Sequence, residues 1–289
     1  MKIVNYGETS PENLILALGY FDAVHKGHTA VLTCAVNLAK KHSKVAGALI
    51  FTGGKCKKDV FSLEERIRKI SSLGIEVIIV KPLDKAFMSK TKTEFLQEIT
   101  ALYNVEKVVS GEDFTFGNGA QGNVSTLVQF FGEDRVITQK LLYDGDEKYS
   151  STKIKSALSN GDIKQANFYL GDRYFISGEV LRGKGLGAKI GFPTANLKIS
   201  EEKFPLASGV YSTVVDVDGV FYKAITNCGE QPTVNGFNYV VEAHILNFNG
   251  DLYGKNITVY FEDKIRDIIK FSSLDELIEQ LAKDKGFIL

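Results

Sequence analysis

The chain has 289 residues, of which 44% are hydrophobic and 24% charged, the composition of an ordinary globular protein with enough residues for two domains. Its 35 basic residues balance its 35 acidic ones, so no net charge draws it to nucleic acid or to an anionic membrane surface. Three scattered cysteines, Cys34, Cys56 and Cys228, without a signal-peptide or membrane-span segment predict a cytoplasmic protein with reduced thiols.

Short apolar segments alternate with helical patterns through the first half of the chain. Predicted strands cover 14–18, 44–51, 75–80, 105–109 and 135–142. Predicted helices cover 27–41, a segment that opens at Ser62 with Glu65 at capping-box spacing, 93–103 and 124–131. Repeated βα units of this kind predict a Rossmann-like domain, with a parallel sheet and helices on both faces.

The second half is rich in β-branched and aromatic residues. Its predicted strands cover 174–181, 209–217, 220–228, 239–246 and 256–261, and turn signals separate them. This spacing predicts an antiparallel barrel or sandwich, closed by a helix whose capping box is Ser273 and Glu276. A short linking helix at 159–172 separates the halves, so the predicted domains are 1–158 and 164–289.

The segment GYFDAVHKGH (19–28) places His25 and His28 after the first strand, at the start of the first long helix. Parallel sheets bind ligands beyond the carboxyl ends of their strands, and the N-terminus of a helix attracts phosphate. Two imidazoles there can donate hydrogen bonds to phosphate oxygens, and Gly27 lets the backbone approach closely. The alternatives are a surface accident or half of a metal site, although no nearby ligand set completes a zinc geometry.

Two further segments fit an anionic, aromatic ligand. SSTKIK (150–155) predicts a helix capped by Ser150 or Ser151, with Lys153 and Lys155 in its first turn. Cations at this end of a helix are unfavourable next to the positive end of the dipole, and a bound anion between them would explain their presence. The loop 111–123 contains four glycines and two phenylalanines, whose flat faces suit an aromatic ring. Alone, these are an ordinary capped helix and a loop pinned by two buried phenylalanines.

These segments together resemble the adenylyltransferase module of bacterial bifunctional riboflavin kinase/FMN adenylyltransferases, the FAD synthetases. The second half resembles the kinase module of the same family in GKGLGAKIGFPTANL (183–197), GVYS (209–212), NCGEQPT (227–233), VEAHIL (241–246), LYG (252–254) and the closing helix. The resemblance spans nearly the whole chain in the order of the family. It implies a nucleotidyltransferase domain followed by a β-barrel riboflavin kinase domain.

The resemblance also implies the chemistry. The second module would phosphorylate riboflavin to FMN with ATP, and the first would transfer AMP from ATP to FMN, giving FAD and pyrophosphate. Riboflavin, FMN, FAD and ATP would be the partners, and Mg²⁺ the metal. No oligomeric state is predicted.

By the same resemblance, each module has its own set of site residues, with His28 and Glu242 as the catalytic ones. ATP in the adenylyltransferase would contact Gly19, Phe21, Asp22, His25, Gly27, His28, Ser151, Thr152 and Lys155. The flavin there would contact Asp113, Phe114 and Phe116. In the kinase, ATP would contact Gly183, Gly187, Gly191, Pro193, Thr194 and Asn196, with Thr194 and Asn196 also on the metal. Glu242, as general base, and Arg266 would contact riboflavin.

The chain departs from the family pattern at several positions. Phe21-Asp22-Ala23 stands where the family usually has FDG, so Ala23 takes the place of a glycine. TGGKC (52–56) replaces a Pro-His-Pro segment, with Lys55 and Lys57 as compensating cations, and Lys155 replaces an arginine. In the kinase module, Ala188 and Ile268 stand where relatives often carry an arginine and an acidic residue. Two alternatives therefore stay open. One is an FAD synthetase with a vestigial kinase barrel, and the other a non-catalytic flavin-binding regulatory paralogue.

Three other interpretations fit less well. An aminoacyl-tRNA synthetase shares H-x-G-H and a lysine-rich segment such as 87–92, but here that segment precedes a helix capped by Thr91 or Thr93. A nucleotidyltransferase acting on phosphopantetheine or a cytidylyl acceptor would not carry GFPTAN. GKGLGAKIG leads into Phe192-Pro193 and not into a helix, which excludes a dinucleotide fingerprint.

Overall fold

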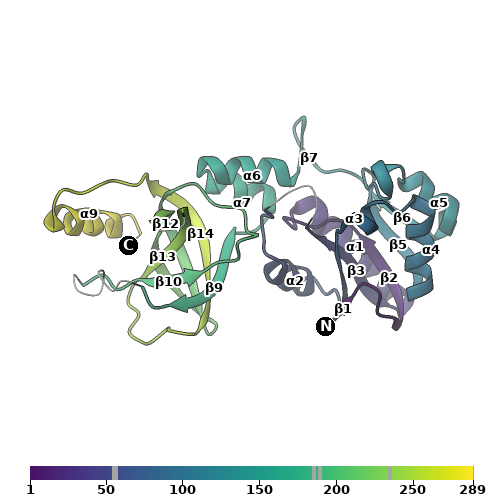
Figure 1. Ribbon diagram of the computed structural model, residues 1–289, viewed down its shortest axis with the longest axis horizontal. Helices are drawn as coiled ribbons and strands as arrows, with labels where there is room; N and C mark the ends of the chain where they lie inside the picture. The colour runs from purple at the N-terminus through teal and green to yellow at the C-terminus, as the bar shows by residue number, and fades with distance from the viewer. Residues whose placement is uncertain (54–57, 184–186, 188–190, 234–235, 289) are drawn as a thin grey trace. The chain divides into compact units, whose positions relative to one another are not determined.

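The computed structural model describes the chain except residues 54–57, 184–186, 188–190, 234–235 and 289, and the side chains of 231–238 also lie outside the described part (Figure 1). The chain divides into two compact units, an N-terminal unit of Met1–Ser151 and a C-terminal unit of Thr152–Leu289. In the part of the chain so described, no helix combines the length and the apolar character that crossing a membrane requires.

The N-terminal unit is built on a six-stranded sheet, in which the neighbouring strands are parallel and the order is β1-β4-β3-β2-β5-β6. The strands are β1 (Lys2–Asn5), β2 (Ser10–Leu18), β3 (Val45–Thr52), β4 (Val77–Pro82), β5 (Tyr103–Gly111) and β6 (Val136–Gln139). The predicted parallel sheet is confirmed. The edge strand β1 was not predicted, because four residues are too few to show an alternating pattern.

Helices cover both faces of this sheet, as the βα repeats predicted. They are α1 (Lys26–His42), α2 (Leu63–Ser72), α3 (Lys85–Met88), α4 (Lys92–Leu102) and α5 (Val124–Phe131), with short 3₁₀ turns η1 (Asn118–Ala120) and η2 (Glu133–Arg135) and a hairpin β7 (Tyr143–Asp144) and β8 (Glu147–Lys148). The capping box of Ser62 and Glu65 is present, and Thr91 caps α4.

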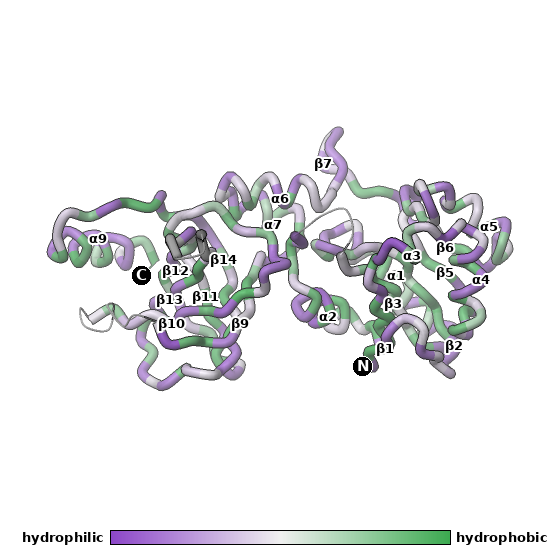
Figure 2. The backbone as a smooth tube through the Cα atoms, viewed as in Figure 1, coloured by the Kyte–Doolittle hydropathy of each residue, from purple (hydrophilic) through white to green (hydrophobic). Residues whose placement is uncertain are grey.

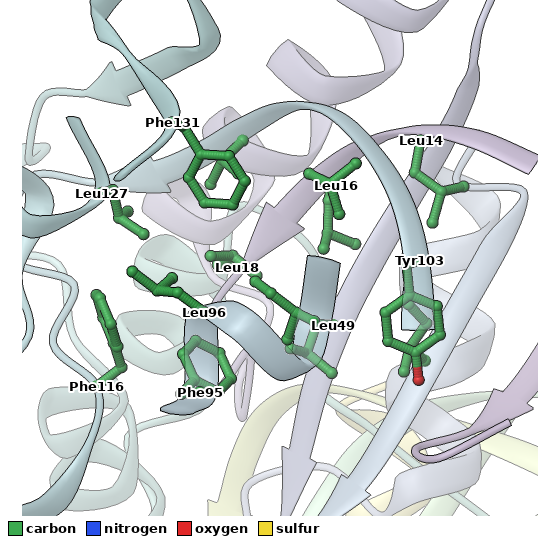
Figure 3. Packing of buried hydrophobic residues seen from close by; sticks show 14 of the residues in the cluster. Leu14, Leu16, Leu18, Leu49, Phe95, Leu96, Tyr103, Phe116, Leu127 and Phe131 are labelled. Atoms are coloured by element: carbon green, nitrogen blue, oxygen red, sulfur yellow. The ribbon is translucent and has the colours of Figure 1, made fainter. Parts of the chain in front are cut away.

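Alternate residues of β2 point into two separate hydrophobic layers. Leu14, Leu16 and Leu18 pack with residues of α4 and α5 on one face (Figure 3), whereas Ile15 and Ala17 pack with residues of α1 and α2 on the other. All five are at most 1% exposed. Figure 2 shows how hydrophobic residues concentrate along the strands. With both faces covered, the edge at the carboxyl ends of the strands is left for a ligand.

The C-terminal unit is a closed antiparallel barrel of order β10-β13-β12-β11-β14-β9, which settles the choice between barrel and sandwich. Its strands are β9 (Phe175–Leu181), β10 (Ala195–Lys198), β11 (Gly209–Val217), β12 (Val220–Thr233), β13 (Gly236–Ile245) and β14 (Asn256–Arg266). Its helices are α6 (Ser151–Asn160), α7 (Ile163–Leu170) and α9 (Leu274–Gly286). The predicted linking helix is α7, which ends at Gly171 in a left-handed conformation.

Alternation along the strands separates the inside of the barrel from its outer face. Tyr211, Thr213 and Val215 on β11 are fully buried, and the residues between them are partly exposed. The closing helix α9 leads to Ile288, which packs on Val210, Ile225 and Leu246. Val210 and Ile225 have the outward parity of their strands, so the chain end covers part of the outer face.

The predicted capping box of the closing helix is half present. The hydroxyl of Ser273 accepts the backbone N–H of Glu276 at 3.2 Å, as expected for an N-cap. The carboxylate of Glu276 accepts instead from the backbone N–H and the hydroxyl of Ser272, at 3.0 Å and 2.9 Å. The residue before the cap therefore takes the bond that the sequence pattern assigned to Ser273.

Candidate functional site

The loop that joins β2 to α1 is tightly built and almost fully buried. Phe21, Ala23 and Val24 are at most 2% exposed, and Phe21 and Val24 have φ of 51° and 45°. A positive φ is unusual for any residue other than glycine and a genuine outlier for a β-branched one such as Val24, so surrounding contacts must hold this loop. One contact is the Phe21 ring against Gly19, where a Cβ would lie 2.7 Å from the ring.

The carboxylate of Asp22 helps to hold the loop, because Oδ1 accepts the backbone N–H of Val60 at 2.6 Å. Asp22 is 5% exposed, so this bond is well shielded from water. Its predicted contact with ATP stays a prediction. Ala23 is not among the residues with positive φ, so the departure from FDG requires no left-handed backbone from an alanine.

His25 and His28 lie against each other at the start of α1. Their ring centroids are 3.7 Å apart with an interplanar angle of 15°, and the Phe21 ring meets His28 edge-on at 5.3 Å. His25 is the N-cap of α1, because its Nδ1 accepts the backbone N–H of His28 at 3.3 Å. An Nδ1 that accepts carries no proton, so the proton of the neutral ring is on Nε2, which is thus a donor.

Burial and nearby positive charge keep both imidazoles neutral. Burial, and after it the charge of Lys148, lowers the pKa of His25 to about 4, against a smaller opposing effect of Asp113. The pKa of His28 lies well below its ordinary value because of burial and then the charges of His25, Lys148 and Arg66. The Nδ1 of His28 is buried and has no hydrogen-bond partner in the described chain, so this atom is able to bond to a ligand.

The lowered pKa of His25 predicts a specific dependence of stability on pH. Because the ring titrates near 4 when folded and near 6.5 when unfolded, the unfolded chain binds the proton first as the pH falls. The contribution of His25, about 3 kcal/mol for such a shift, is complete above pH 6.5 and is lost progressively down to about pH 4. The measurement is hydrogen exchange of the β2 amides across this range.

The control is His25→Asn, which keeps an N-cap acceptor but does not ionise. We expect the β2 amides of this variant to lose less protection than the wild type between pH 6.5 and 4. An identical loss in both proteins would contradict the assignment of a neutral, buried His25.

Two charged residues that the sequence did not indicate border this site. Lys148, on β8, forms an ion pair with Asp113, and its charge acts on both histidines. Arg66, on α2, is 1% exposed and donates to the carbonyl oxygens of Tyr20 and Phe51. Their sequence contexts carry no signal, since Lys148 precedes SSTKIK and Arg66 has the spacing of an ordinary helix residue.

The two phenylalanines predicted for flavin binding have different places. Phe116 is 7% exposed and belongs to the core, where a Cβ at Gly122 would lie 2.6 Å from its ring. Phe114 is half-buried and stacks on Phe116 with centroids 5.7 Å apart and an interplanar angle of 23°. Phe116 therefore supports Phe114. The contacts of both rings, and of Asp113, with a flavin stay predictions.

The helix of the SSTKIK segment falls at the division of the chain. Ser151 ends the N-terminal unit, and Thr152 begins the C-terminal unit. Lys155 lies in the C-terminal unit, with its Nζ 5.8 Å from the centroid of the Phe204 ring. The approach of these three residues to the triphosphate of ATP stays a prediction.

In the barrel, strand register brings predicted kinase residues together. Asn196 on β10 pairs directly with Glu242 on β13, and Glu242 pairs on its other side with Asn227 on β12. Directly paired residues of antiparallel strands share one face. Val241 and Ala243 are fully buried in the barrel, so this row of three polar residues faces outward. Asn227 belongs to the NCGEQPT motif but was not predicted as a site residue.

The loop before β10 is packed closely around Asn196. A Cβ at Gly183 would lie 2.4 Å from the Asn196 amide nitrogen, and one at Gly187 would lie 2.3 Å from a backbone oxygen. Gly191 has φ of 84°, which favours glycine. The Asn196 amide donates to the Thr194 carbonyl at 3.4 Å.

The side chain of His244, also on β13, holds the same loop. Its Nδ1 is 2.8 Å from the carbonyl oxygen of Pro193, and its ring packs on Phe192 with centroids 5.2 Å apart. Ala188, one of the departures, lies outside the described residues, as do Lys55 and Lys57.

The guanidinium of Arg266 binds within the C-terminal unit. Its Nε and Nη2 donate to the Asp284 carboxylate at 2.9 Å and 2.7 Å, and Nη1 donates to the Asp267 carbonyl. Asp284 is fully buried, so this bidentate pair fastens α9 to β14. The predicted contact of Arg266 with riboflavin stays a prediction, and Ile268 is 47% exposed nearby in the chain.

A parallel α/β unit with H-x-G-H at a helix start, joined to a closed barrel carrying GFPTAN, defines the class as a two-module transferase. The family model for FAD synthetase matches residues 7–153, and that for riboflavin kinase matches residues 170–288. The chain belongs to the family of bifunctional riboflavin kinase/FMN adenylyltransferases, transferases of flavin cofactor biosynthesis.

Individual relatives match over nearly the whole chain. The bifunctional riboflavin kinase/FMN adenylyltransferase of Bacillus subtilis is 34% identical over 94% of this chain and 90% of its own length. The protein of that name from Escherichia coli is 32% identical over 99% and 96%. A crystal structure described as a macrolide-efflux protein from Streptococcus pneumoniae is 30% identical, with a TM-score of 0.87 over 98% of this chain and 97% of that one.

Proposed function

We propose that both modules of this chain are active: the barrel phosphorylates riboflavin to FMN with ATP, and the N-terminal unit adenylylates FMN to FAD with release of pyrophosphate. The observation that carries the proposal is the direct pairing of Asn196 with Glu242, since the alternative with one active module has a vestigial barrel. In a vestigial barrel, nothing would keep the Asn196 amide, proposed for the metal, opposite the Glu242 carboxylate, proposed as the general base.

In the kinase reaction, Glu242 accepts the proton of the ribityl hydroxyl as this oxygen attacks the γ-phosphorus of ATP and ADP leaves. The Thr194 hydroxyl donates to the phosphates, and the Asn196 amide oxygen would hold them through Mg²⁺. Gly183 and Gly187 leave room for the Asn196 side chain and the loop backbone. Because proton and phosphoryl group are both positioned from one outer face, a loss of strand register would stop the reaction.

The donor set fits Mg²⁺, which prefers a few protein oxygens together with phosphate oxygens. Thr194 and Asn196 supply such oxygens, and the residues with described positions contain no cluster of three His, Cys, Asp or Glu suited to another metal. When bound, Mg²⁺ neutralises phosphate charge.

In adenylyl transfer, a phosphate oxygen of FMN attacks the α-phosphorus of ATP, and the bond to pyrophosphate breaks. His28 and the Nε2–H of His25 donate to oxygens that gather negative charge in the transition state. Ser151, Thr152 and Lys155 hold the β- and γ-phosphates. Gly19, Phe21, Asp22 and Gly27 shape the ATP pocket, with the flavin near Asp113 and Phe114.

The remaining proposals concern the context of the enzyme. The domain boundary lies between 158 and 164, where α6 ends and α7 begins. The protein acts in the cytoplasm, which is supported by the free thiols of Cys34 and Cys228. Arg266 contacts riboflavin while its guanidinium stays paired with Asp284 of α9.

The test incubates the full chain with ATP and Mg²⁺ plus either riboflavin or FMN and separates the products by chromatography. We expect FMN and FAD from riboflavin, and FAD from FMN. FAD from FMN without any FMN from riboflavin would leave an FAD synthetase with a vestigial kinase barrel. Tight flavin binding without either product would indicate a regulatory paralogue.

A further inference from the structure

Arg66 is a buried arginine at the edge of the adenylyltransferase site. Its side chain is 1% exposed, although arginine is among the residues least often found inside proteins. Nη1 donates to the Phe51 carbonyl at 2.8 Å and to the Tyr20 carbonyl at 3.2 Å, and Nη2 lies 3.3 Å from Oδ2 of Asp59. Its Nε has no hydrogen-bond partner in the part of the chain that the structure describes.

These contacts join β2 and β3, the two strands next to the loop that carries His25 and His28. Phe51 is near the carboxyl end of β3, and Tyr20 comes two residues after the end of β2, which pairs with β3. Their carbonyls lie where the ladder between parallel strands ends, and one guanidinium satisfies both. The hydroxyl of Tyr20 in turn lies 3.4 Å from Asp59, so the same segment is held from both sides.

The Tyr20 carbonyl is the last group before the strained part of the loop. Phe21 follows directly with its positive φ, and the next side chain, Asp22, accepts the N–H of Val60. Asp59, Val60 and Arg66 therefore clamp the chain on both sides of Phe21. The Phe21 ring touches His28, so the clamp is one residue removed from the catalytic imidazoles.

Stability alone does not explain an arginine here. A buried ion pair is often no more stabilising than apolar residues of the same volume, because taking charges from water is costly. Asp59 retains some exposure, and one donor of Arg66 is unused. What the arginine provides beyond packing is a fixed geometry for two carbonyls and a permanent positive charge at the carboxyl edge of the sheet.

We propose that Arg66 is a positioning residue for adenylyl transfer, which fixes the loop that carries His25 and His28 and adds positive charge at the edge where the phosphates of ATP bind. This inference rests on the proposed function. Arg66 does not touch the reacting atoms in this scheme; it acts through the Tyr20 carbonyl and through its charge.

The first experiment compares Arg66→Met with Arg68→Met, a matched control on an exposed position of the same helix. We expect Arg66→Met to lower kcat for FMN adenylylation by about 10²-fold, the effect of a small displacement of catalytic groups, with a smaller change in KM. Arg66→Lys keeps the charge and should recover part of the rate. Arg68→Met should be close to wild type, and all three should phosphorylate riboflavin at the wild-type rate.

A second readout does not depend on activity. The imidazole titrations of the full chain are followed by NMR, and loss of the Arg66 charge should raise the pKa of His28. The charged or titratable groups that act on the rings are Lys148 on both, Asp113 on His25, and His25 and Arg66 on His28. If Arg66 only filled space, removal of its charge would leave the His28 titration unchanged. Arg66→Lys keeps the charge, so it should shift the pKa of His28 less than Arg66→Met does.

Arg66→Met removes the guanidinium that neutralises the Asp59 carboxylate, which can unfold the N-terminal unit of this variant. The double variant Asp59→Asn/Arg66→Met removes both charges, and it should fold and still show slow adenylylation. Wild-type adenylylation by the folded double variant, or by Arg66→Met, would overturn the inference, as would an unchanged His28 titration in Arg66→Met. A wild-type chain that makes no FAD from FMN would contradict the proposed function instead, and the titration would still decide about Arg66.

Discussion

Replacing His28 by alanine is expected to lower FMN-to-FAD turnover about 10²-fold, which is typical for the loss of one transition-state donor. The ring is held between His25 and Phe21, and burial and neighbouring charges keep it neutral. A neutral ring held in this way is ready to donate to an oxygen of the α-phosphate without first being reoriented. The measurement is the steady-state rate of FAD formation from FMN and ATP.

The control for this variant is His42→Ala, which removes an exposed histidine at the other end of α1. It should adenylylate FMN at the wild-type rate. His28→Ala should still phosphorylate riboflavin normally, because that reaction belongs to the barrel. If His28→Ala turns over FMN within about threefold of the wild-type rate, His28 is not a transition-state donor.

The architecture was predictable because it rests on local patterns. Short apolar runs indicated β2 and β3, and apolar stripes indicated the long helices. Ser62 marked one helix start, and of the two alternatives Thr91 and Thr93 the structure confirms Thr91 at another. Such signals arise from contacts between residues close in sequence, together with one buried face. The short strand β1 gave no such signal, since its four residues are too few to show a pattern.

The supporting residues of the sites could not be predicted, because their roles come from contacts distant in sequence. Arg66 bonds to Tyr20 and Phe51, and nothing in the helix around it distinguishes it from the exposed Arg68. Asn227 lies opposite Glu242 through the register of β12 and β13, which the residue types alone do not show. Charge in a helix pattern normally indicates a solvated face, and that expectation fails where a helix packs on a ligand-binding edge.

Two residues that match the family pattern have structural partners of their own. Phe116 fills the core beside Gly122, and Arg266 is paired with the buried Asp284. A motif identifies the residue type at a position but not whether its side chain is engaged elsewhere. Glu242 in the barrel lies in an outward row that contains Asn196, a residue proposed for the metal and phosphates.

Replacing Glu242 by glutamine is therefore expected to suppress riboflavin phosphorylation by about 10²–10⁴-fold, the usual contribution of a positioned general base. Glutamine keeps the size and an acceptor oxygen but cannot take up the ribityl proton. Riboflavin binding should persist, and FMN adenylylation should continue at the wild-type rate because its residues belong to the other module. The rates of FMN and FAD formation, measured separately from riboflavin and from FMN, check both statements.

The matched control is Glu179→Gln, an exposed glutamate on β9 of the same barrel, which should phosphorylate riboflavin normally. Because both variants remove one carboxylate from one barrel, a difference between them isolates the position opposite Asn196 from a general effect of charge. Equal phosphorylation by Glu242→Gln and the wild type would show that Glu242 is not the base. The strand register would then place Asn196 beside a carboxylate with another role, and the proton of the ribityl hydroxyl would need a different acceptor on the same outer face.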